Sequence, residues 1–435
     1  MPRRSCIVDG DVDTLDQAVW DPEAMDEPPS DLDPADWNPR DLVFRADPLP
    51  WYRALRQKAP VFSHEEIGIV LSRYEDIDRV LRDRRFGVAT PSPWREVFAA
   101  GAPPSMYLLS EHSLLFIDPP QHTRVRGLVA QAFTPRRIEA LRPRIGAIID
   151  GVLDALDDHR TFDVLEEIAW PIPIMGVTDL LDVPATDQEL LHRWTHAITA
   201  VDELPLEFEL LPAAGEAADE FLTYASGLVD ERRRHPGDDL ISGLIAAQQE
   251  DGEALHREEL LSMIVLILLA GHDTTASLIS TALWLLLSHP DQTDEVRNNP
   301  DVVPGAIEEV LRFFGPLQVA SGGGRWPDEP VTIEDTVIEP GTPVRLLLGS
   351  ANRDPAQYDD PDRFDIHRES IRHLAFGRGL HVCLGSALGR LEAQVVVPAV
   401  LRHFPDLRLV DDRPTWRPSF VVRQLATLAV DTGHN

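Results

Sequence analysis

Apolar side chains recur every three to four residues along most of this chain, which is the spacing of a helix with one buried side. Shorter or alternating apolar runs typical of strands are fewer, and two of them flank the turn Pro340-Gly341-Thr342. The pattern therefore predicts a mainly α fold with a small β part. The predicted helices are 50–58, 74–82, 122–133, 135–157, 213–234, 257–288, 304–314 and 386–403, and the predicted strands are 61–71, 331–338 and 343–348.

The segment from Arg257 to Ser288 is the longest predicted helix, about 45 Å at 1.5 Å per residue. Its middle is apolar on every side, which predicts a helix buried through the core. Yet the stretch Ala270 to Thr275 (AGHDTT) places an acid and two hydroxyls in this middle. Such groups oppose helix propensity and are costly to bury, so the exception indicates a functional role.

The first 41 residues differ in composition from the rest of the chain. They hold twelve carboxylates, three Arg and six Pro, with few apolar residues. This mixture cannot bury enough surface to offset chain entropy, so we expect an acidic, flexible tail. No linker or repeat divides the remainder, and 42–435 is predicted to be one domain.

Charge and cysteine content narrow the function classes. The formal net charge of −33 excludes a nucleic-acid binder and disfavours anionic membranes, because phosphate would be repelled. The longest apolar run, 260–271, is shorter than the about twenty residues of a membrane span. Only two Cys are present and no export signal is visible, which predicts a cytoplasmic protein without a disulfide framework.

The loop from Phe376 to Gly385 (FGRGLHVCLG) carries the strongest candidate chemistry. Its two internal glycines allow the backbone to turn tightly beside a flat ligand. Cys383 precedes a predicted helix, and a helix N-terminus favours a thiolate. A thiolate that binds a metal fits this pattern, and no paired Cys, His-Glu-x-x-His, phosphate loop or Gly-x-Ser-x-Gly elbow offers another site.

These motifs together resemble the cytochrome P450 family, in particular its soluble bacterial members. The Cys loop is similar to the haem-binding signature, and Ala270 to Thr275 resembles the oxygen-activating part of the long helix. Glu309-Val310-Leu311-Arg312 and Pro361 to Phe364 resemble two further family motifs, and Ala351 to Pro355 is similar to the bacterial members. The likeness covers residues 45–430 and implies the P450 fold, with the long central helix over the haem.

The resemblance implies a haem b whose iron is bound by the Cys383 thiolate, with dioxygen as co-substrate. Phe376 would lie beside the sulfur, and four cationic residues would neutralise the haem propionates. The cofactor-binding set is then Cys383, Phe376, Gly385, His381, Arg325, His122 and Arg126.

Two smaller groups of residues complete the implied site. Asp273 and Thr274 would deliver protons, the Thr hydroxyl bonding the carbonyl one turn back and so opening a groove in the helix. His272 would be a packing or water-binding residue. A buried triad of Glu309, Arg312 and Arg363 would hold the core beside the haem.

A basic patch suggests the partner that supplies electrons. Residues 119–144 contain six Arg and one acid, and together with Arg372 and Arg378 they would steer an acidic ferredoxin. No Gly-x-Gly-x-x-Gly motif is present, so a fused reductase is not expected, and the ferredoxin and its reductase would be separate proteins.

The sequence thus predicts a haem-thiolate monooxygenase that hydroxylates or epoxidises a bulky hydrophobic small molecule in secondary-metabolite biosynthesis. Oxidative phenol coupling or ring formation on the same fold is the alternative, and a non-catalytic haem binder or a Cys-dependent hydrolase is more remote. Aromatic and apolar side chains from several segments would line the substrate pocket, namely Trp94, Phe98, Met106, Tyr107, Trp194, Phe208 and Phe420.

Overall fold

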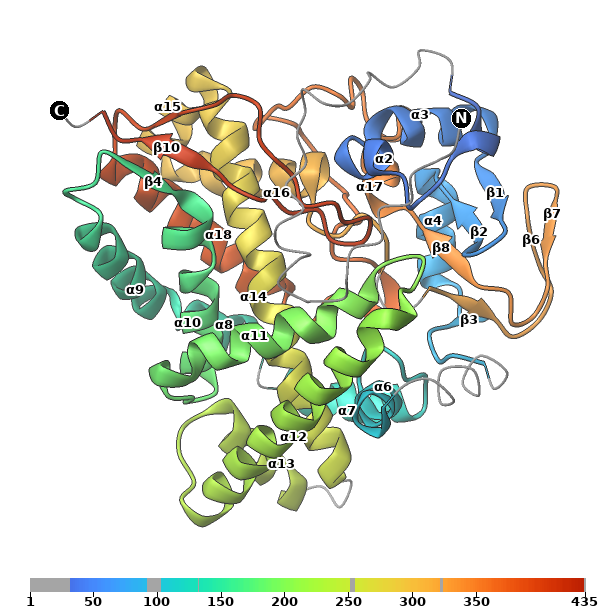
Figure 1. Cartoon of the computed structure of the whole chain (residues 1–435), viewed down its shortest axis with the longest axis horizontal. Helices are drawn as coiled ribbons and strands as arrows, with labels where there is room; N and C mark the ends of the chain where they lie inside the picture. Colours follow the sequence, from blue (N-terminus) through green and yellow to red (C-terminus); the bar gives the residue numbers. More distant parts are fainter. Residues whose placement is uncertain (1–31, 92–102, 132, 251–254, 321–323, 434–435) are drawn as a thin grey trace.

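The protein was analysed as a computed structural model, which describes residues 32–91, 103–131, 133–250, 255–320 and 324–433. Helices dominate it, and the strands are short (Figure 1). The helices are α2 Leu42–Ala46, α3 Leu49–Lys58, α4 Tyr74–Arg82, α6 Pro104–His112, α7 Gln121–Ala130, α8 Pro135–Glu139, α9 Arg142–Ala155, α10 Pro171–Leu180, α11 Gln188–Thr199, α12 Leu211–Arg234, α13 Leu240–Glu250, α14 Arg257–Leu287, α15 Pro290–Asn298, α16 Val303–Phe314, α17 Leu348–Ala351 and α18 Ser386–His403.

The β part is made of several small sheets, and one of them, through β9, contacts the long helix α14. Strand β2 pairs antiparallel with β1 and parallel with β8, and the other strands form a hairpin, a short pair and a second three-stranded sheet. The strands are β1 Val61–His64, β2 Gly68–Leu71, β3 Phe86–Gly87, β4 Thr161–Asp163, β5 Trp326–Pro327, β6 Val331–Ile333, β7 Thr336–Ile338, β8 Val344–Leu346, β9 Arg408–Leu409 and β10 Ala429–Asp431.

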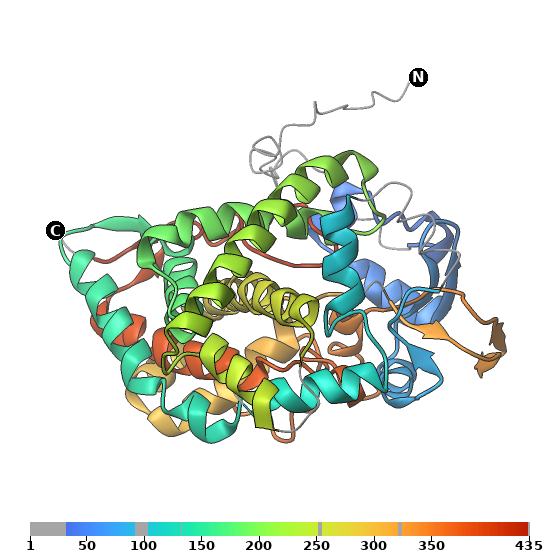
Figure 2. The same cartoon turned by 90° about the horizontal axis from the view of Figure 1, so that it is seen from below.

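Helix α14 runs through the centre of the fold, as its all-round apolar pattern predicts. Glu259 accepts the N–H of His256 and closes a capping box at its start. Figure 2 looks nearly along α14, the yellow-green helix of residues 257–287, and shows other helices around it. By length and composition α14 could cross a membrane, but 67% of its most apolar window is buried in the fold.

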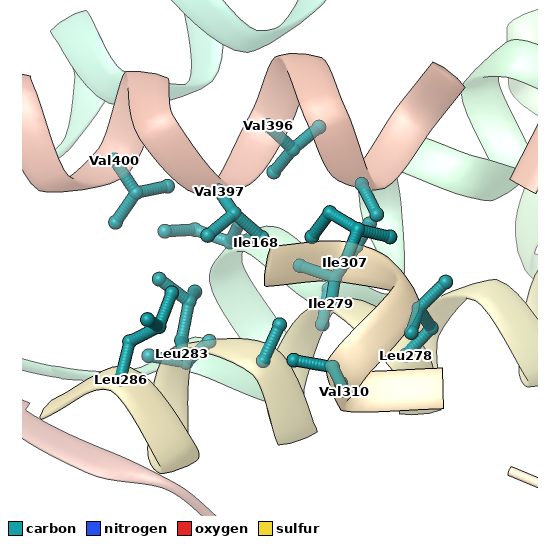
Figure 3. Packing of buried hydrophobic residues seen from close by; sticks show 14 of the residues in the cluster. Ile168, Leu278, Ile279, Leu283, Leu286, Ile307, Val310, Val396, Val397 and Val400 are labelled. Atoms are coloured by element: carbon teal, nitrogen blue, oxygen red, sulfur yellow. The ribbon is translucent and has the colours of Figure 1, made fainter. Parts of the chain in front are cut away.

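The main hydrophobic core joins α14 to α16 and α18. Leu278, Ile279 and Leu283 of α14 interlock with Ile307 of α16 and Val397 of α18 (Figure 3). A second core places α10, α11 and α12 against the N-terminal half of α14. The helix is therefore held on both sides of the AGHDTT stretch, which fixes the position of that stretch in the fold.

Three predicted elements differ from the observed ones. The predicted helix 135–157 is two helices, because Pro143 fits the first turn of α9 but would break a continuous helix. The predicted strand 61–71 is a hairpin whose Gly68 has a φ of +85°. The strand 331–338 likewise turns at Glu334, which has a φ of +49°.

The predicted tail ends earlier than residue 41. Asp33 caps a short 3-10 turn, Pro34–Asp36. Trp37 follows it and is 3% exposed, packed edge-on against Phe44 and Phe420. Residues 32–41 therefore belong to the folded body, because one Trp side chain buries enough area to hold them. The expectation for residues 1–31 lies outside the described residues.

Candidate active site

The Cys383 loop leads from a 3-10 turn, η8 (Gly379–His381), into the first turn of α18. The Cys383 N–H donates to the Phe376 carbonyl at 2.9 Å, which closes the loop. Gly377 and Gly379 have φ angles of +65° and +73°, a region that residues with a Cβ rarely adopt. A Cβ on Gly379 would also lie 2.2 Å from the Leu81 carbonyl oxygen of α4. Both glycines are thus required by the backbone, as the sequence pattern predicts.

The Cys383 thiol lies at the N-terminal end of α18 and is accessible on one side. Burial by the surrounding chain raises the pKa of the thiol, and the N–H groups of Gly385 and Ser386 act in the opposite direction. Arg126 and Arg390 also favour the thiolate. The thiol thus has an accessible side and a set of groups that stabilise its anion, which suits a metal ligand.

The middle of α14 has an unusually accessible side. Ala270 is exposed although the helix around it is buried. The Thr274 hydroxyl donates to the Ala270 carbonyl at 2.8 Å, which confirms the hydrogen bond predicted for this residue. Thr275 donates to Gly271 at 3.0 Å in the same way. Two successive bonds of this kind loosen a helix locally and leave its polar atoms reachable.

The two accessible features belong to helices that pack on each other. Helices α14 and α18 are in direct contact. At their crossing, a Cβ added to Gly389 of α18 would lie 3.6 Å from the Thr275 hydroxyl of α14. Thr275 thus faces α18, while Thr274 turns to a different side of α14, about 100° around the helix. The structure therefore brings the Cys383 end of α18 and the AGHDTT stretch into one region.

Asp273 is held by its neighbour in sequence. The His272 Nε2 lies 3.0 Å from the Asp273 Oδ1, and the same nitrogen lies 3.1 Å from the Nδ1 of His192 on α11. Burial would raise the pKa of Asp273, but the charge and hydrogen bond of His272, with smaller contributions from His192 and His196, together lower it to about 2. His272 therefore binds the acid directly, and His192 is a contact that the sequence did not indicate.

The four residues predicted to neutralise propionates come from three parts of the chain. The His122 and His381 rings lie 4.2 Å apart between centroids. Arg126 donates to the Val382 carbonyl at 2.6 Å. Arg325 is buried, which lowers its pKa to about 10, although the charge of Asp118 favours the cation. The sequence missed Asp118, which lies 3.7 Å from His381 and accepts backbone N–H groups from residues 88 and 89.

The His122 side chain provides a test of whether these residues suit a haem. It is 1% exposed, and neither ring nitrogen has a hydrogen-bond partner within the described ranges. Burial, and then His381 and Arg126, lower the pKa of His122 to about 4. A buried ring among cations needs an acceptor, and a propionate carboxylate supplies one. Together with the accessible Cys383 thiol, this orphaned ring fits a haem.

The predicted triad is correct in two of its three members. Arg312 forms two hydrogen bonds of 2.7 Å to Glu309, and both side chains are fully buried. Arg363 was predicted wrongly: its guanidinium is exposed and pairs with Asp365, and only its backbone carbonyl accepts a bond from Arg312. The second cation is Arg368, 3.4 Å from Glu309. The backbone of residue 363 faces the pair, so its side chain points outward.

Two residues predicted to line the pocket belong to the core instead. The Trp194 indole stacks near Phe221 and donates to Glu220 at 2.7 Å, so it packs between α11 and α12. Phe420 is 2% exposed among Trp37 and Phe44. Met106 is half-buried, and Tyr107 and Phe208 are exposed. The predictions for Trp94 and Phe98 lie outside the described residues.

Several arginines of the predicted basic patch already have acidic partners. Arg124 pairs with the buried Glu259, and Arg144 pairs with Asp179. Arg142 pairs with Glu139 at 2.5 Å, and Arg378 lies 3.4 Å from Asp78. Arg136 and Arg137 of α8 are exposed. The positive potential of this surface is therefore weaker than the count of arginines predicts.

Comparisons with known proteins agree with the geometry. The sequence profile of the family "Cytochrome P450" matches residues 213–424. The cytochrome P450 monooxygenase PikC of Streptomyces venezuelae is 40% identical over 89% of this chain and 91% of its own length. The 6-deoxyerythronolide B hydroxylase of Saccharopolyspora erythraea is 37% identical over 90% and 98%.

A solved relative has the same fold. The crystal structure of P450BioI in complex with a hexadecenoic acid ligated to acyl carrier protein superposes with a TM-score of 0.83. It is 34% identical in sequence and covers 89% of this chain and 99% of its own. The two full-length relatives, this fold and the Cys383 loop lead to one conclusion: the chain belongs to the cytochrome P450 family and is a monooxygenase of the bacterial type.

Proposed function

We propose that this monooxygenase inserts one oxygen atom of dioxygen into a bulky hydrophobic small molecule, by hydroxylation or epoxidation, in secondary-metabolite biosynthesis. PikC and the 6-deoxyerythronolide B hydroxylase, which align with nearly the whole chain, support this substrate class. The P450BioI complex includes an acyl carrier protein, so both free and carrier-bound substrates belong in a screen.

The observation that carries the proposal is the accessible side of Cys383, in the region where α14 exposes Ala270. A haem b bound here would be held by the Cys383 thiolate, with His122, Arg126, Arg325 and His381 toward its propionates. When bound, a haem with a thiolate ligand supplies the chemistry that activates dioxygen. Gly377 and Gly379 keep the loop in the shape that presents the thiol. Phe376 fixes that shape through its carbonyl.

The chain's own contribution to turnover is the handling of protons above the thiol. Asp273 is ionised at neutral pH and is partly exposed, so its carboxylate can accept hydrogen bonds and take part in a proton relay while His272 holds Oδ1. The Thr274 hydroxyl donates to Ala270, so its oxygen remains free to accept a hydrogen bond. This acid and alcohol would pass protons from bulk water toward the oxygen that is reduced.

The electrons would come from a separate ferredoxin and its reductase in the cytoplasm. The exposed Arg136 and Arg137 of α8 offer positive charge for an acidic partner. The described residues from 32 onward would act as one catalytic domain. Residues 1–31 have no part in this proposal.

The test of the haem ligand is Cys383→Ser. We expect the wild-type protein, reduced and exposed to carbon monoxide, to show the strongly red-shifted Soret band of a thiolate ligand. The variant should lose that band completely, because a Ser hydroxyl does not replace the thiolate. Retention of the band in the variant would overturn the assignment of Cys383. Incorporation of labelled dioxygen into product then distinguishes oxygen insertion from oxidative coupling.

A further inference from the structure

Three side chains from two helices direct nitrogen and oxygen atoms at one point beside the α11–α14 contact. They are His192 of α11 and the neighbours His272 and Asp273 of α14, and one ligand atom of each lies within 4.8 Å of the other two. His272 Nε2 is 3.1 Å from His192 Nδ1 and 3.0 Å from Asp273 Oδ1. Neighbouring ligands of a tetrahedral zinc ion with bonds of 2.0–2.1 Å are about 3.3 Å apart. The cluster thus needs only small shifts to enclose an ion.

The His272 ring is oriented by a hydrogen bond on the side away from the cluster. The Leu268 carbonyl, one turn back on α14, also accepts a hydrogen bond from the His272 ring. Because Nε2 faces Asp273 and His192, Nδ1 is the nitrogen that donates to Leu268, and a metal ion bound at Nε2 would replace the proton that the charged ring carries there. A second bond of this kind is what orients most histidines that bind metals.

A proton on Nε2 cannot satisfy all three groups. It can be directed well at Asp273 or at His192, and the other group then lacks a well-aligned partner. A metal ion placed between the three atoms accepts all three lone pairs at once. It would also offset the negative charge that Asp273 brings into a largely buried place.

The cluster is reachable and lies in a favourable field. His272 is 2% exposed, whereas the Asp273 side chain is 20% exposed, so an ion can enter from the Asp273 side. The chain's net charge of −33 draws cations toward it. His196, one turn along α11, is hydrogen-bonded by Arg417 at 3.2 Å and is left outside the ligand set.

We propose that His192, His272 and Asp273 form a site for a divalent transition-metal ion of the zinc class, with water completing the coordination. Two imidazole nitrogens and one carboxylate oxygen are donors that suit Zn²⁺, whereas Mg²⁺ and Ca²⁺ prefer oxygen alone. The ion would tie α11 to α14 and occupy the Asp273 carboxylate. Bound zinc would therefore slow proton delivery, a consequence that rests on the proposed role of Asp273, while the binding itself does not.

The experiment measures zinc binding without turnover. Haem-loaded protein without an affinity tag is stripped with a chelator and titrated calorimetrically with Zn²⁺, and separately with Mg²⁺. We expect saturable binding of one Zn²⁺ per chain at this site and no binding of Mg²⁺. His192→Gln should weaken this binding at least about tenfold, as should Asp273→Asn, because each removes one ligand.

The matched control is His367→Gln. His367 lies 2.9 Å from Glu295 on the surface, a His–carboxylate pair that has no third ligand among the residues the structure describes, and its loss should leave zinc affinity unchanged. The carbon monoxide spectrum shows that each variant retains its haem and fold. Failure of the wild type to bind Zn²⁺, or equal affinity in the wild type and His192→Gln, would overturn the site. The effect of zinc on turnover is measured in a separate experiment. Calorimetry therefore tests the metal site, and the turnover rate tests the role of Asp273.

Discussion

Two acidic side chains on neighbouring helices, Glu309 and Asp273, have different surroundings. Glu309 of α16 is fully buried and receives two bonds from Arg312, one from the backbone N–H of residue 365, and the charge of Arg368. Asp273 of α14 is partly exposed, and its nearest partner is His272, an imidazole that can gain or lose a proton. The first acid is fixed by permanent cations, whereas the second is held by a partner that can change its charge.

We expect this difference to separate a structural pair from the pair proposed to deliver protons. A carboxylate surrounded by guanidinium groups cannot exchange a proton at physiological pH, because arginine stays charged. A carboxylate beside a histidine and an accessible surface can. Sequence spacing does not make this distinction, since both acids lie on helices near a cationic or titratable neighbour. The two acids are distinguished by their burial and by the identity of their partners.

The largest expected effect is on the structural pair. Arg312→Met should lower the free energy of unfolding by about 3–5 kcal/mol, because Glu309 would remain buried without its main partner. Denaturant unfolding of the haem-loaded protein measures the loss. Arg234→Met is the control: it removes an exposed pair with Glu231 at the same i,i+3 spacing, and should cost less than about 1 kcal/mol. Similar losses in the two variants would contradict the structural role.

The functional pair should show the opposite behaviour. Asp273→Asn should slow substrate oxidation by about 100-fold or more through loss of proton transfer. It should lower the free energy of unfolding by about 1–2 kcal/mol, less than Arg312→Met does, because only the bond to His272 is lost. The rate is measured with chelator-treated protein, so that metal ions have no influence. Ser280→Ala removes a buried hydroxyl that bonds Ala276 on the same helix, and should keep the wild-type rate. An unchanged rate in Asp273→Asn would show that the Asp273 carboxylate has no part in proton delivery.

An intermediate case lies next to Glu309. Burial would raise the pKa of Glu308, but hydrogen bonds from His373 and Arg390 lower it to about 2. A lowered pKa means that the ionised acid stabilises the fold above about pH 4.5, and that this contribution is lost as pH falls toward 2. In Glu308→Gln the midpoint of thermal unfolding should therefore fall less steeply over this range. Because Arg390 is partly exposed, we expect an effect of about 1–2 kcal/mol. Parallel pH profiles of the wild type and Glu308→Gln would show that the ionised Glu308 contributes nothing to the stability of the fold.

The smallest expected effect distinguishes two arginines of one segment, Arg363 and Arg368. Arg368→Ala should lower the free energy of unfolding by about 1–2 kcal/mol, since the side chain is largely buried and bonds the carbonyls of Asp359 and Asp360 as well as Glu309. Arg363→Ala should cost less than about 0.5 kcal/mol, because its guanidinium is exposed. Denaturant unfolding compares them, and the reverse order would restore Arg363 to the triad.

The parts of the site that sequence predicted are those fixed by neighbours along the chain. The sequence indicated the Cys383 loop through Gly377 and Gly379, because their positive φ angles are a local requirement of the backbone. Glu309 and Arg312 meet because an i,i+3 spacing on a helix is sufficient. Thr274 bonds Ala270 for the same reason. Helical periodicity likewise indicated α14 and α18 with nearly the observed ends.

The parts that sequence missed depend on how distant segments pack. His192 reaches His272 only because α11 crosses α14, across 80 positions of sequence. Trp194, two residues along the same helix, points to α12, and no local signal shows which residue faces which neighbour. Arg368 replaces Arg363 because the backbone between them turns. Side-chain direction in a loop follows tertiary contacts that spacing does not encode.

The contact between Gly379 and Leu81 has a consequence for how the protein matures. It joins residues 298 positions apart, and the Cys383 loop fits only when α4 is already in place beneath it. Bringing such distant segments together is among the slower steps in folding. The Cys383 loop therefore reaches its final shape only after nearly the whole chain has been synthesised, and we expect haem uptake to follow that step rather than accompany synthesis.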